Sequence, residues 1–406
     1  MTDDLAPIFG GPPGWPRRQL RAVLNERREY GRPDLPLLSV SSRQGVRVRA
    51  GERDEGLRAT GDLEAYLVVH PGDLVVNKLV ARSGAFGVSS HHGIVSPAYY
   101  CFTPETNQVD PRYLDYALHS EPGIGEIWRK SKDLPPNAFD ISREKFGKIF
   151  VPLPPLDTQR RIADMLDTET ARIDTLIEKN ERVLTLLQRR WQSLLEQVIF
   201  GYASARRVPL WLVCEITPGY AFHSNEFRLE GSVRLLRGIN VGVGGIDWRE
   251  TVYADVSTVE SAEEYQLVEG DLVVGMDRPW ISAGLRVAQV RAVDEPAYLV
   301  QRVARLRPRT GLDRDYLYRA LQSRQFYAAF EPLMTGVSVP HVSGGQIGAF
   351  KIPLPDLQSQ QRIVSHLAKA RERSEDLRRA VERQQELLRL RRQALITAAV
   401  TGQIEV

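Results

Sequence analysis

The sequence predicts an α+β fold in which two tandem mixed α/β domains are joined by two long helices that pair as an antiparallel coiled coil. Three observations carry this prediction: the chain contains the same module twice, each copy opens with a β-rich region, and each copy ends in a long helical repeat. We place the first domain at 1–156, the first helix at 157–202, the second domain at 203–355 and the second helix at 356–406. A duplication of this kind predicts a pseudo-twofold architecture.

The repeat is clearest where each helix begins. The sequence VPLPPLDTQRRI at 151–162 returns as IPLPDLQSQQRI at 352–363, an offset of 201 residues. Further back, GDLVV at 72–76 returns at 270–274, an offset of 198 residues. A unit of about 200 residues is too long for a solenoid repeat, so the chain holds two copies of a whole module.

The first part of each copy is rich in β-branched residues that alternate with Gly and Pro. An example is the apolar run 66–69, followed by His70-Pro71-Gly72-Asp73 and a second apolar run. Such punctuation predicts short strands joined by tight turns. Helical segments are expected late in each copy, at 112–120 and 315–323.

The second part of each copy predicts one long helix. The prolines block a helix upstream, so Asp157 or Thr158 is expected as the first N-cap and Ser359 as the second, with Gly201 and Gly402 as C-caps. Each helix spans roughly 43 residues, or about 65 Å. Apolar residues recur at steps of four and three, and we expect them to form the coiled-coil seam: Ile162, Leu166, Ile173, Leu176, Val183, Leu187, Ile363, Leu367, Leu377, Val381, Leu388 and Leu395.

The two helices are expected to run antiparallel. The first must return the chain to a second globular copy before the second begins, so a direct hairpin is impossible. In a duplicated chain this favours a pseudo-twofold rod with one domain at each end. Two helices that pack only on their own domains are the alternative, and their length argues against it because helices of globular domains are usually much shorter.

The composition is that of a globular protein with no membrane segment. The chain has 406 residues, 54 Lys and Arg against 51 Asp and Glu, and 2 Cys, which excludes a collagen, a disordered tail and a disulfide scaffold. The N-terminus lacks a signal-peptide pattern, so we expect a cytoplasmic protein without a membrane partner. A net charge of +3 does not by itself predict nucleic-acid binding. Arg greatly outnumbers Lys, which suits phosphate and guanine recognition, but taken alone this excess is better explained by a GC-rich genome.

Catalytic and metal-binding motifs are missing. The sequence contains no Gly-x-x-x-x-Gly-Lys loop, no Asn-Pro-Pro-aromatic motif and no Asp/Glu-x-Lys nuclease core, and Gly242-Val243-Gly244-Gly245 lacks the third Gly of a dinucleotide fingerprint. The seven His show no ligand spacing with Cys, so no metal site is expected. The pattern favours a protein that is not an enzyme.

The chain resembles the specificity subunits of type I restriction-modification systems over essentially its whole length. In that family two target recognition domains alternate with two helical regions, and each helix follows a Pro-Leu-Pro-Pro-Leu then Glu-Gln-x-x-Ile signature. Residues 152–162 and 353–363 match this signature, with Thr158 and Ser359 in place of its Glu. Both substitutes are good helix N-caps.

The resemblance implies a non-catalytic subunit that binds double-stranded DNA and joins two modification (methyltransferase) subunits. Each recognition domain would read one half of a bipartite target, and the coiled coil would set the spacing between the halves and dock the partners. No cofactor of its own is implied, since S-adenosylmethionine, ATP and Mg would bind partner subunits. Whether two restriction (nuclease and translocase) subunits also join stays open.

Residues that could contact DNA are sought in loops that occupy equivalent places in the two copies. Base readers are mainly Arg, Lys, Asn, Gln and Ser, with aromatic residues as wedges. The candidates follow the GDLVV strands and the earlier Leu-Leu pairs: Arg43, Arg47, Asn77, Lys78, Arg82, Ser83, Arg237, Asn240, Arg278 and Trp280, with Asp277 in the same loop.

Two other functions remain open at this point. One is a coiled-coil scaffold or assembly protein whose globular domains bind proteins rather than DNA, and the other is an orphan nuclease or methyltransferase. The missing motifs argue against the second. The scaffold is distinguished from a DNA-binding protein by the salt dependence of binding. Binding that neutralises several DNA phosphates weakens steeply as the salt concentration rises.

Overall fold

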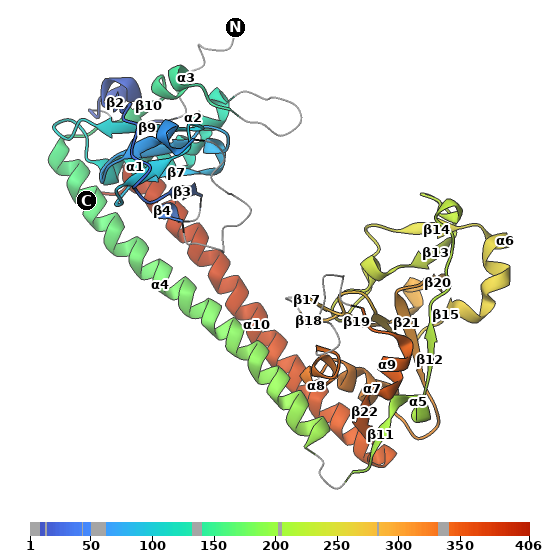
Figure 1. Cartoon of the computed structure of the whole chain (residues 1–406). Coiled ribbons are helices and arrows are strands. Elements are labelled where there is room, and N and C mark those ends of the chain that lie inside the picture. The colour runs from blue at the N-terminus through green and yellow to red at the C-terminus, as the bar shows by residue number, and fades with distance from the viewer. Residues whose placement is uncertain are drawn as a thin grey trace. The chain divides into compact units, whose positions relative to one another are not determined.

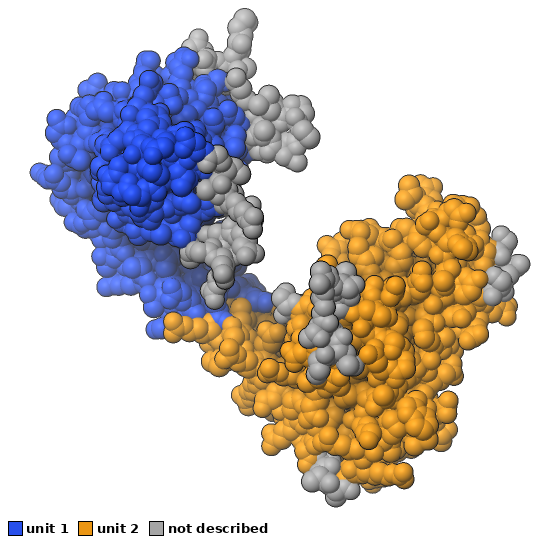
Figure 2. All heavy atoms as spheres, in the orientation of Figure 1, with its two compact units in different colours: residues 1–181, 382–406 blue, residues 182–381 orange. Residues whose placement is uncertain are grey.

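The computed structural model describes residues 9–12, 14–42, 44–49, 62–131, 140–201, 205–281, 284–331 and 341–406. The chain divides into two units, residues 1–181 with 382–406 and residues 182–381 (Figures 1 and 2). Each unit contains one mixed domain and a stretch of both long helices. The division therefore falls inside the helices, because each domain packs on the stretches of both helices that lie beside it.

The domain of the first unit is built around a four-stranded antiparallel sheet of order β2-β9-β6-β7. Its strands are β2 (Leu24–Glu26), β9 (Tyr99–Pro104), β6 (Leu74–Asn77) and β7 (Phe86–Val88). Three two-stranded sheets accompany it: β1 (Arg17–Gln19) with β10 (Phe150–Pro152), β3 (Leu38–Ser41) with β4 (Gly45–Val48), and β5 (Leu67–Val69) with β8 (Gly93–Val95). Its helices are α1 (Pro111–His119), α2 (Glu121–Lys130) and α3 (Arg143–Gly147).

The second unit repeats this arrangement with the sheet β12-β21-β16-β19. The equivalent elements are β12 (Cys214–Pro218), β21 (Val303–Pro308), β16 (Leu272–Gly275), β19 (Val287–Gln289), the pair β11 (Arg207–Pro209) and β22 (Lys351–Pro353), and helices α7 (Arg314–Leu321), α8 (Arg324–Ala328) and α9 (Gly344–Ala349).

The second unit also contains elements that enlarge its domain. A second sheet has the order β14-β13-β20-β15, in which β13 and β20 pair parallel. The additional elements are β13 (Val233–Leu236), β14 (Val252–Ala254), β15 (Gln266–Leu267), β20 (Ala297–Leu299), the hairpin β17 (Trp280–Ile281) with β18 (Gly284–Leu285), and the short helices α5 (Leu210–Val213) and α6 (Val256–Val259).

The central strands β6 and β16 explain why GDLVV recurs. Leu74, Val75 and Val76 are fully buried, as expected for a strand with protein on both faces. The Gly that precedes each strand lies in the left-handed region, with φ of +92° at Gly72 and +94° at Gly270. A side chain at either place would strain the turn, so Gly is required there.

The long helices are α4 (Leu156–Leu195), extended by a π-helical turn at Glu196–Phe200, and α10 (Leu357–Val400). In the first unit, Ile162 and Leu166 near the start of α4 share a core with Ile396 and Val400 at the end of α10. Two contacts link the helices there: Gln385 Nε2 donates to Glu181 Oε1 at 3.2 Å, and Arg392 Nε to Asp174 Oδ1 at 3.1 Å. The helices therefore run antiparallel.

The second unit shows the converse pairing. Leu195, near the end of α4, shares a core with Ile363 and Leu367 near the start of α10. The α+β class with an antiparallel helix pair is thus confirmed. The described residues include no helix that is both long and apolar enough to cross a membrane.

The seam between the helices differs in part from the expected one. Leu176 and Leu377 are 43% and 48% exposed and lie outside the buried seam, while Ile177 is half-buried beside the Leu176 position. A shift of one residue turns a helical side chain by about 100°, enough to move it off the seam. The remaining expected residues are at least half-buried: Ile162, Leu166, Ile173, Val183, Leu187, Ile363, Leu367, Val381, Leu388 and Leu395.

The helix caps also need correction. Helix α10 is capped by Asp356, whose Oδ1 accepts the Ser359 N–H at 2.9 Å, so Ser359 itself lies in the first turn. Helix α4 starts after Pro155, whose carbonyl accepts the N–H groups of Thr158 and Gln159 at 2.8 and 3.0 Å. An acidic or hydroxyl residue is favourable both at the N-cap and in the first turn of a helix. The residue type alone therefore does not tell the two positions apart.

Candidate nucleic-acid interface

A buried glutamine fixes each domain to its long helix. Gln159 Nε2 donates to the carbonyls of Gln108 and Pro154, and its Oε1 accepts the Asp110 N–H at 3.0 Å. Gln360 makes the same three bonds in the second unit, with Gly311, Pro355 and Asp313. The two side chains are 1% and 0% exposed. Glutamine suits this place because its amide both donates and accepts.

The same joint contains a capping aspartate and a tyrosine in each copy. Asp110 accepts the N–H of Tyr113 at the start of α1, and Asp313 accepts that of Tyr316 at the start of α7. The Tyr113 hydroxyl donates to the Pro152 carbonyl at 2.8 Å, and that of Tyr316 to Pro353 at 2.9 Å. Burial raises the pKa of Tyr113, so its hydroxyl stays protonated and can donate. The joint thus holds the domain rigidly on the helix.

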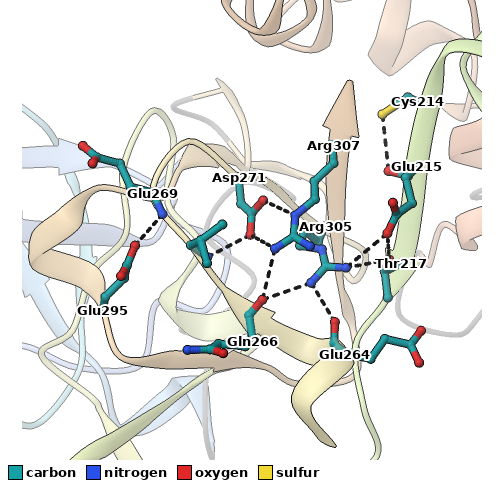
Figure 3. A network of polar contacts seen from close by, with 11 residues as sticks. Cys214, Glu215, Thr217, Glu264, Gln266, Glu269, Asp271, Glu295, Arg305 and Arg307 are labelled. Atoms are coloured by element: carbon teal, nitrogen blue, oxygen red, sulfur yellow. Dashed lines mark hydrogen bonds and ion pairs between the residues drawn. The ribbon is translucent and has the colours of Figure 1, made fainter. Parts of the chain in front are cut away.

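A buried carboxylate shapes the turn before each central strand. Asp271 is 3% exposed and is held by Arg307, whose Nε and Nη2 donate to Oδ1 and Oδ2 at 2.6 and 2.9 Å (Figure 3). The neighbouring Arg305 donates to the backbone carbonyls of Glu264 and Gln266 at 2.8 and 3.0 Å. These arginines are therefore committed to the fold and not to a ligand.

The first unit keeps the carboxylate and changes its partner. Asp73 is 1% exposed and accepts from Arg27 Nε at 2.7 Å and from the Thr103 hydroxyl at 2.9 Å. Arg27 follows β2, whereas Arg307 belongs to β21, which is the equivalent of β9. The Arg27–Asp73 hydrogen bond is the main reason that the Arg27 pKa is raised.

The candidates after β6 lie in one turn. Asn77 Oδ1 accepts the Leu79 N–H at 3.2 Å, and the Ser83 hydroxyl donates to the Val80 carbonyl at 2.7 Å, so these two side chains shape the turn itself. The Arg82 guanidinium lies over the Trp128 ring, 4.5 Å from its centroid. Trp128 is 54% exposed, which makes this cation–aromatic pair accessible.

Lys78 belongs to a cluster that residues distant in sequence complete. The Lys78 ammonium is 6.0 Å and the Arg143 guanidinium 4.9 Å from the centroid of the Tyr100 ring. The Tyr100 hydroxyl donates to the Ile141 carbonyl at 3.3 Å, and burial raises its pKa. Arg143 also pairs with Glu26 at 2.9 Å. We call Lys78, Tyr100 and Arg143 the first cluster.

The second unit has a different cluster at the equivalent place. His341 Nδ1 lies 2.7 Å from Asp277 Oδ1, and Arg302 Nη1 lies 3.8 Å from the same oxygen. Arg278 follows directly, exposed and in the left-handed region at φ 44°. We call Asp277, Arg278, Arg302 and His341 the second cluster.

An aromatic pair adjoins the second cluster. The Trp280 ring packs on Tyr327 of α8, with centroids 4.7 Å apart. Arg286 lies beneath the loop and donates to the carbonyls of Val241 and Asp277 at 2.9 Å each, and burial lowers its pKa. Arg286 therefore supports the loop from inside.

The candidates after the earlier Leu-Leu pairs are not arranged alike. Arg47 lies half-buried on β4, and Arg43 is outside the described residues. Asn240 is 1% exposed, and its Nδ2 donates to the Asp247 and Glu250 carbonyls. Arg237 Nη2 donates to the same Glu250 carbonyl at 2.6 Å. The placement of Asn240 is incompatible with base contact, because its side chain is buried and its amide is hydrogen-bonded within the loop.

The polar clusters of the described ranges contain no metal site. No group of three or more His, Cys, Asp or Glu in that part of the chain could hold an ion. The exposed chemistry at the strand ends is cationic and aromatic, which suits phosphates and base edges.

Comparison with known proteins points to one family. The model of the type I restriction modification DNA specificity domain matches residues 212–384. The chain is 25% identical over 327 residues to the type I restriction enzyme MjaVIII specificity subunit of Methanocaldococcus jannaschii, which spans 77% of this chain and 75% of that protein. Together these matches support a specificity subunit of a type I restriction-modification system. This specificity subunit is also 35% identical over 150 residues to the EcoAI specificity subunit of Escherichia coli, covering 37% of this chain and 25% of that protein.

Solved structures share the fold of this specificity subunit. One from a study of complex assembly and conformational transition of the type I R-M system aligns with a TM-score of 0.75 at 19% identity, over 98% of this chain and 100% of that chain. The HsdS subunit of Thermoanaerobacter tengcongensis aligns with a TM-score of 0.52 at 20% identity, over 97% of this chain and 98% of that chain. The comparisons support a DNA target recognition domain and give no support to a protein-binding scaffold.

The sequence did not point to several residues of the two clusters of this specificity subunit. Tyr100, Arg143, Arg302 and His341 lie beside the candidates only in the fold, since 43 residues separate Tyr100 from Arg143 and 39 separate Arg302 from His341. One signal was available: Asp140-Ile141-Ser142 and His341-Val342-Ser343 occupy equivalent places in the repeat.

Proposed function

We propose that this specificity subunit is the non-catalytic DNA reader of a methyltransferase complex, in which each domain reads one half of a bipartite target. One observation carries the proposal: the two domains share their joints and strand turns but present different polar clusters at the same strand end. A dimer of identical readers would recognise a palindrome, whereas two unlike readers on one chain would recognise two unlike half-sites.

The two cysteines do not supply a catalytic nucleophile. Burial raises the pKa of the Cys214 thiol to about 12 and that of Cys101 further still, so neither is a thiolate nucleophile at neutral pH. Methyl transfer and its S-adenosylmethionine would then belong to two modification subunits. ATP and Mg would belong to restriction subunits where these join.

The paired helices offer a docking face for the modification subunits. In the first unit Leu176, Leu387 and Leu390 are 43%, 57% and 58% exposed, and in the second unit Leu186 and Leu377 are 60% and 48% exposed. Leucines at helical spacing on the outside of a helix pair suit contact with further helices. The modification subunits are therefore proposed to pack helices on the exposed leucines of each unit.

The docking proposal is tested by charge substitutions. Leu387→Glu with Leu390→Glu should lower co-purification of the modification subunit at least tenfold, because two carboxylates would be buried in the interface. Leu229→Glu is the matched control, since Leu229 is 88% exposed and precedes β13 in the second domain. Equal loss with the control would refute this docking face.

The coiled coil is proposed to act as a ruler between the half-sites. Adding one heptad to each helix lengthens the pair by about 10.5 Å, which corresponds to roughly 3 base pairs. The methylated target should therefore gain about three base pairs in its spacer and keep both half-sites. An unchanged spacer in an active complex would refute the ruler.

The proposed function is tested by strand-resolved mapping of methylated adenines in the source genome, with the gene intact and with it deleted. Deletion should remove one split, non-palindromic motif and leave all others. Restoration of the motif from a plasmid copy is the control. Persistence of every motif, in cells shown to express the intact gene and its methyltransferase, would contradict the proposal.

A further inference from the structure

The strand end that carries the second cluster differs in chemistry between the two copies. Sheet register aligns Tyr99 with Val303 and Asn77 with Gly275, and the repeat aligns the segments before α3 and α9. The second cluster, Asp277, Arg278, Arg302 and His341, therefore corresponds to Leu79, Val80, Ala98 and Asp140 in the first unit. Three of these positions hold apolar residues in the first unit, and the same positions hold two arginines and an aspartate in the second unit.

Hydrogen bonds from three sources hold the backbone of the second cluster in place. The Met276 N–H donates to the Arg302 carbonyl and the Val342 N–H to the Met276 carbonyl, both at 2.9 Å. Arg286 Nη1 donates to the Asp277 carbonyl at 2.9 Å, and the Asp277 carboxylate contacts His341. Asp277, the residue before Arg278, is thus held by its carbonyl, by its side chain and by the hydrogen bonds of the preceding Met276.

Arg278 itself adopts a conformation that favours glycine. Among the described residues, Arg278 and Arg302 are the non-glycine residues with positive φ, at 44° and 74°. Arg278 also precedes Pro279, whose ring restricts the residue before it further. Strain of this kind persists where surrounding structure enforces it, and it gathers at functional sites. The Arg278 side chain is exposed to solvent, and Trp280, whose ring packs on Tyr327, follows it two residues later.

We propose that Arg278 is a specificity-determining residue that reads a guanine in the half-site of the second domain, and that Asp277, Arg302 and His341 position it. This inference rests on the proposed function. The arginine fork matches the O6 and N7 acceptors of guanine in the major groove. A phosphate contact would serve both domains equally, because the backbone is the same in every sequence. The counterpart of Arg278 is Val80, so the contact belongs to one domain's reading of its own sequence.

The test uses the complex of this chain with its modification subunits and synthetic duplexes of the mapped target. Each duplex carries one base-pair change in the second half-site, and binding is measured by competition for wild type and Arg278→Gly. Glycine removes the guanidinium and relieves the positive φ, so melting of the variant should occur at or above the wild-type temperature. Arg249→Ala, at an exposed arginine elsewhere in the unit, is the matched control.

The expected result is selective. Wild type should discriminate against loss of one G·C pair by about tenfold to a hundredfold, and Arg278→Gly should reduce that discrimination to less than about threefold, with the other positions unchanged. Equal weakening on every duplex would mean a phosphate contact and would overturn the proposal. Unchanged discrimination at all positions would overturn it as well. A wild-type complex that does not discriminate at all would instead refute the proposed function, and the proposal with it.

Discussion

The two recognition domains are alike where they hold themselves together and unlike where they meet solvent at the end of the central strand. Gln159 and Gln360 make the same three hydrogen bonds, and Asp73 and Asp271 cap the same turn. In the first cluster, Lys78 and Arg143 both lie over the Tyr100 ring. In the second cluster, Arg278 follows Asp277, whose carboxylate contacts His341. The comparison teaches that the residues that fix a domain to the helices are separate from the clusters that we propose to read DNA.

The buried aspartates show that the shared part tolerates rearrangement of its details. Asp73 takes its guanidinium from Arg27, after β2, and Asp271 takes it from Arg307, on β21. The charge pair is kept while its donor moves to the neighbouring strand. A buried carboxylate without a cation is costly, so the pair is preserved even when its sequence is not.

Removing either buried aspartate should have the largest effect on stability. Asp271→Ala leaves Arg307 without its carboxylate, and the unfolding free energy of the second unit should fall by about 3–5 kcal/mol. Asp73→Ala should cost the first unit a similar amount, as measured by denaturant unfolding of each variant. Glu269→Ala is the control, since its side chain is exposed. A loss below 1 kcal/mol in one unit would break the equivalence of the two turns.

Loss of the joint glutamines should have the next largest effect. Gln159→Ala and Gln360→Ala each strand one N–H and two carbonyl groups in buried surroundings, and should each cost about 2–3 kcal/mol. Gln358→Ala, two residues before Gln360 and exposed, should change the unfolding free energy by less than about 0.5 kcal/mol. Markedly unequal costs at the two glutamines would show that the joints are similar in geometry only.

The smallest predicted effect distinguishes the units by pH. His119 lies between the Asp115 and Gly84 carbonyls at 3.0 and 3.2 Å, and its equivalent in the second unit is Gln322. Burial lowers the His119 pKa, but the Asp115 carboxylate and the two carbonyls more than offset this, so the pKa is raised overall. The stabilisation is complete below the unfolded pKa of about 6.5 and fades as pH rises through the folded value.

His119→Gln should therefore remove that pH dependence. The difference in unfolding free energy between wild type and His119→Gln should be greatest near pH 6 and shrink towards pH 8, by denaturant unfolding at each pH. A difference that is constant or grows with pH would show that His119 folds in its neutral form.

The fold was predictable to the extent that its signals are local. The heptads of α4 and α10 and the apolar strands after Gly72 and Gly270 follow from short stretches of sequence. The error at Leu176 arose because Ile177 is equally apolar, and packing alone decides which of two neighbours faces the partner helix. Asp356 and Ser359 are both good caps, so the start of α10 was ambiguous in the same way.

The candidate site was less predictable because it is assembled by tertiary contacts. Asn240 resembles a base reader in sequence, yet the fold uses its amide to close a loop. Arg143 and His341 enter the clusters only when α3 and α9 pack beside the central strands. The Gly-Asp and Gln-x-x-Ile repeats marked what the copies share, and no comparable signal marks residues that differ.

The central claim is that each domain reads its own half-site independently of the other. It is tested most directly by mapping methylated adenines in cells that carry Arg278→Gly or the double variant Lys78→Met with Arg143→Gly, which introduces the residues that the second unit has at those places. Arg278→Gly should change the motif in one half only, and the double variant should change it in the other half only. If either variant altered both halves, or if both altered the same half, the claim would be contradicted.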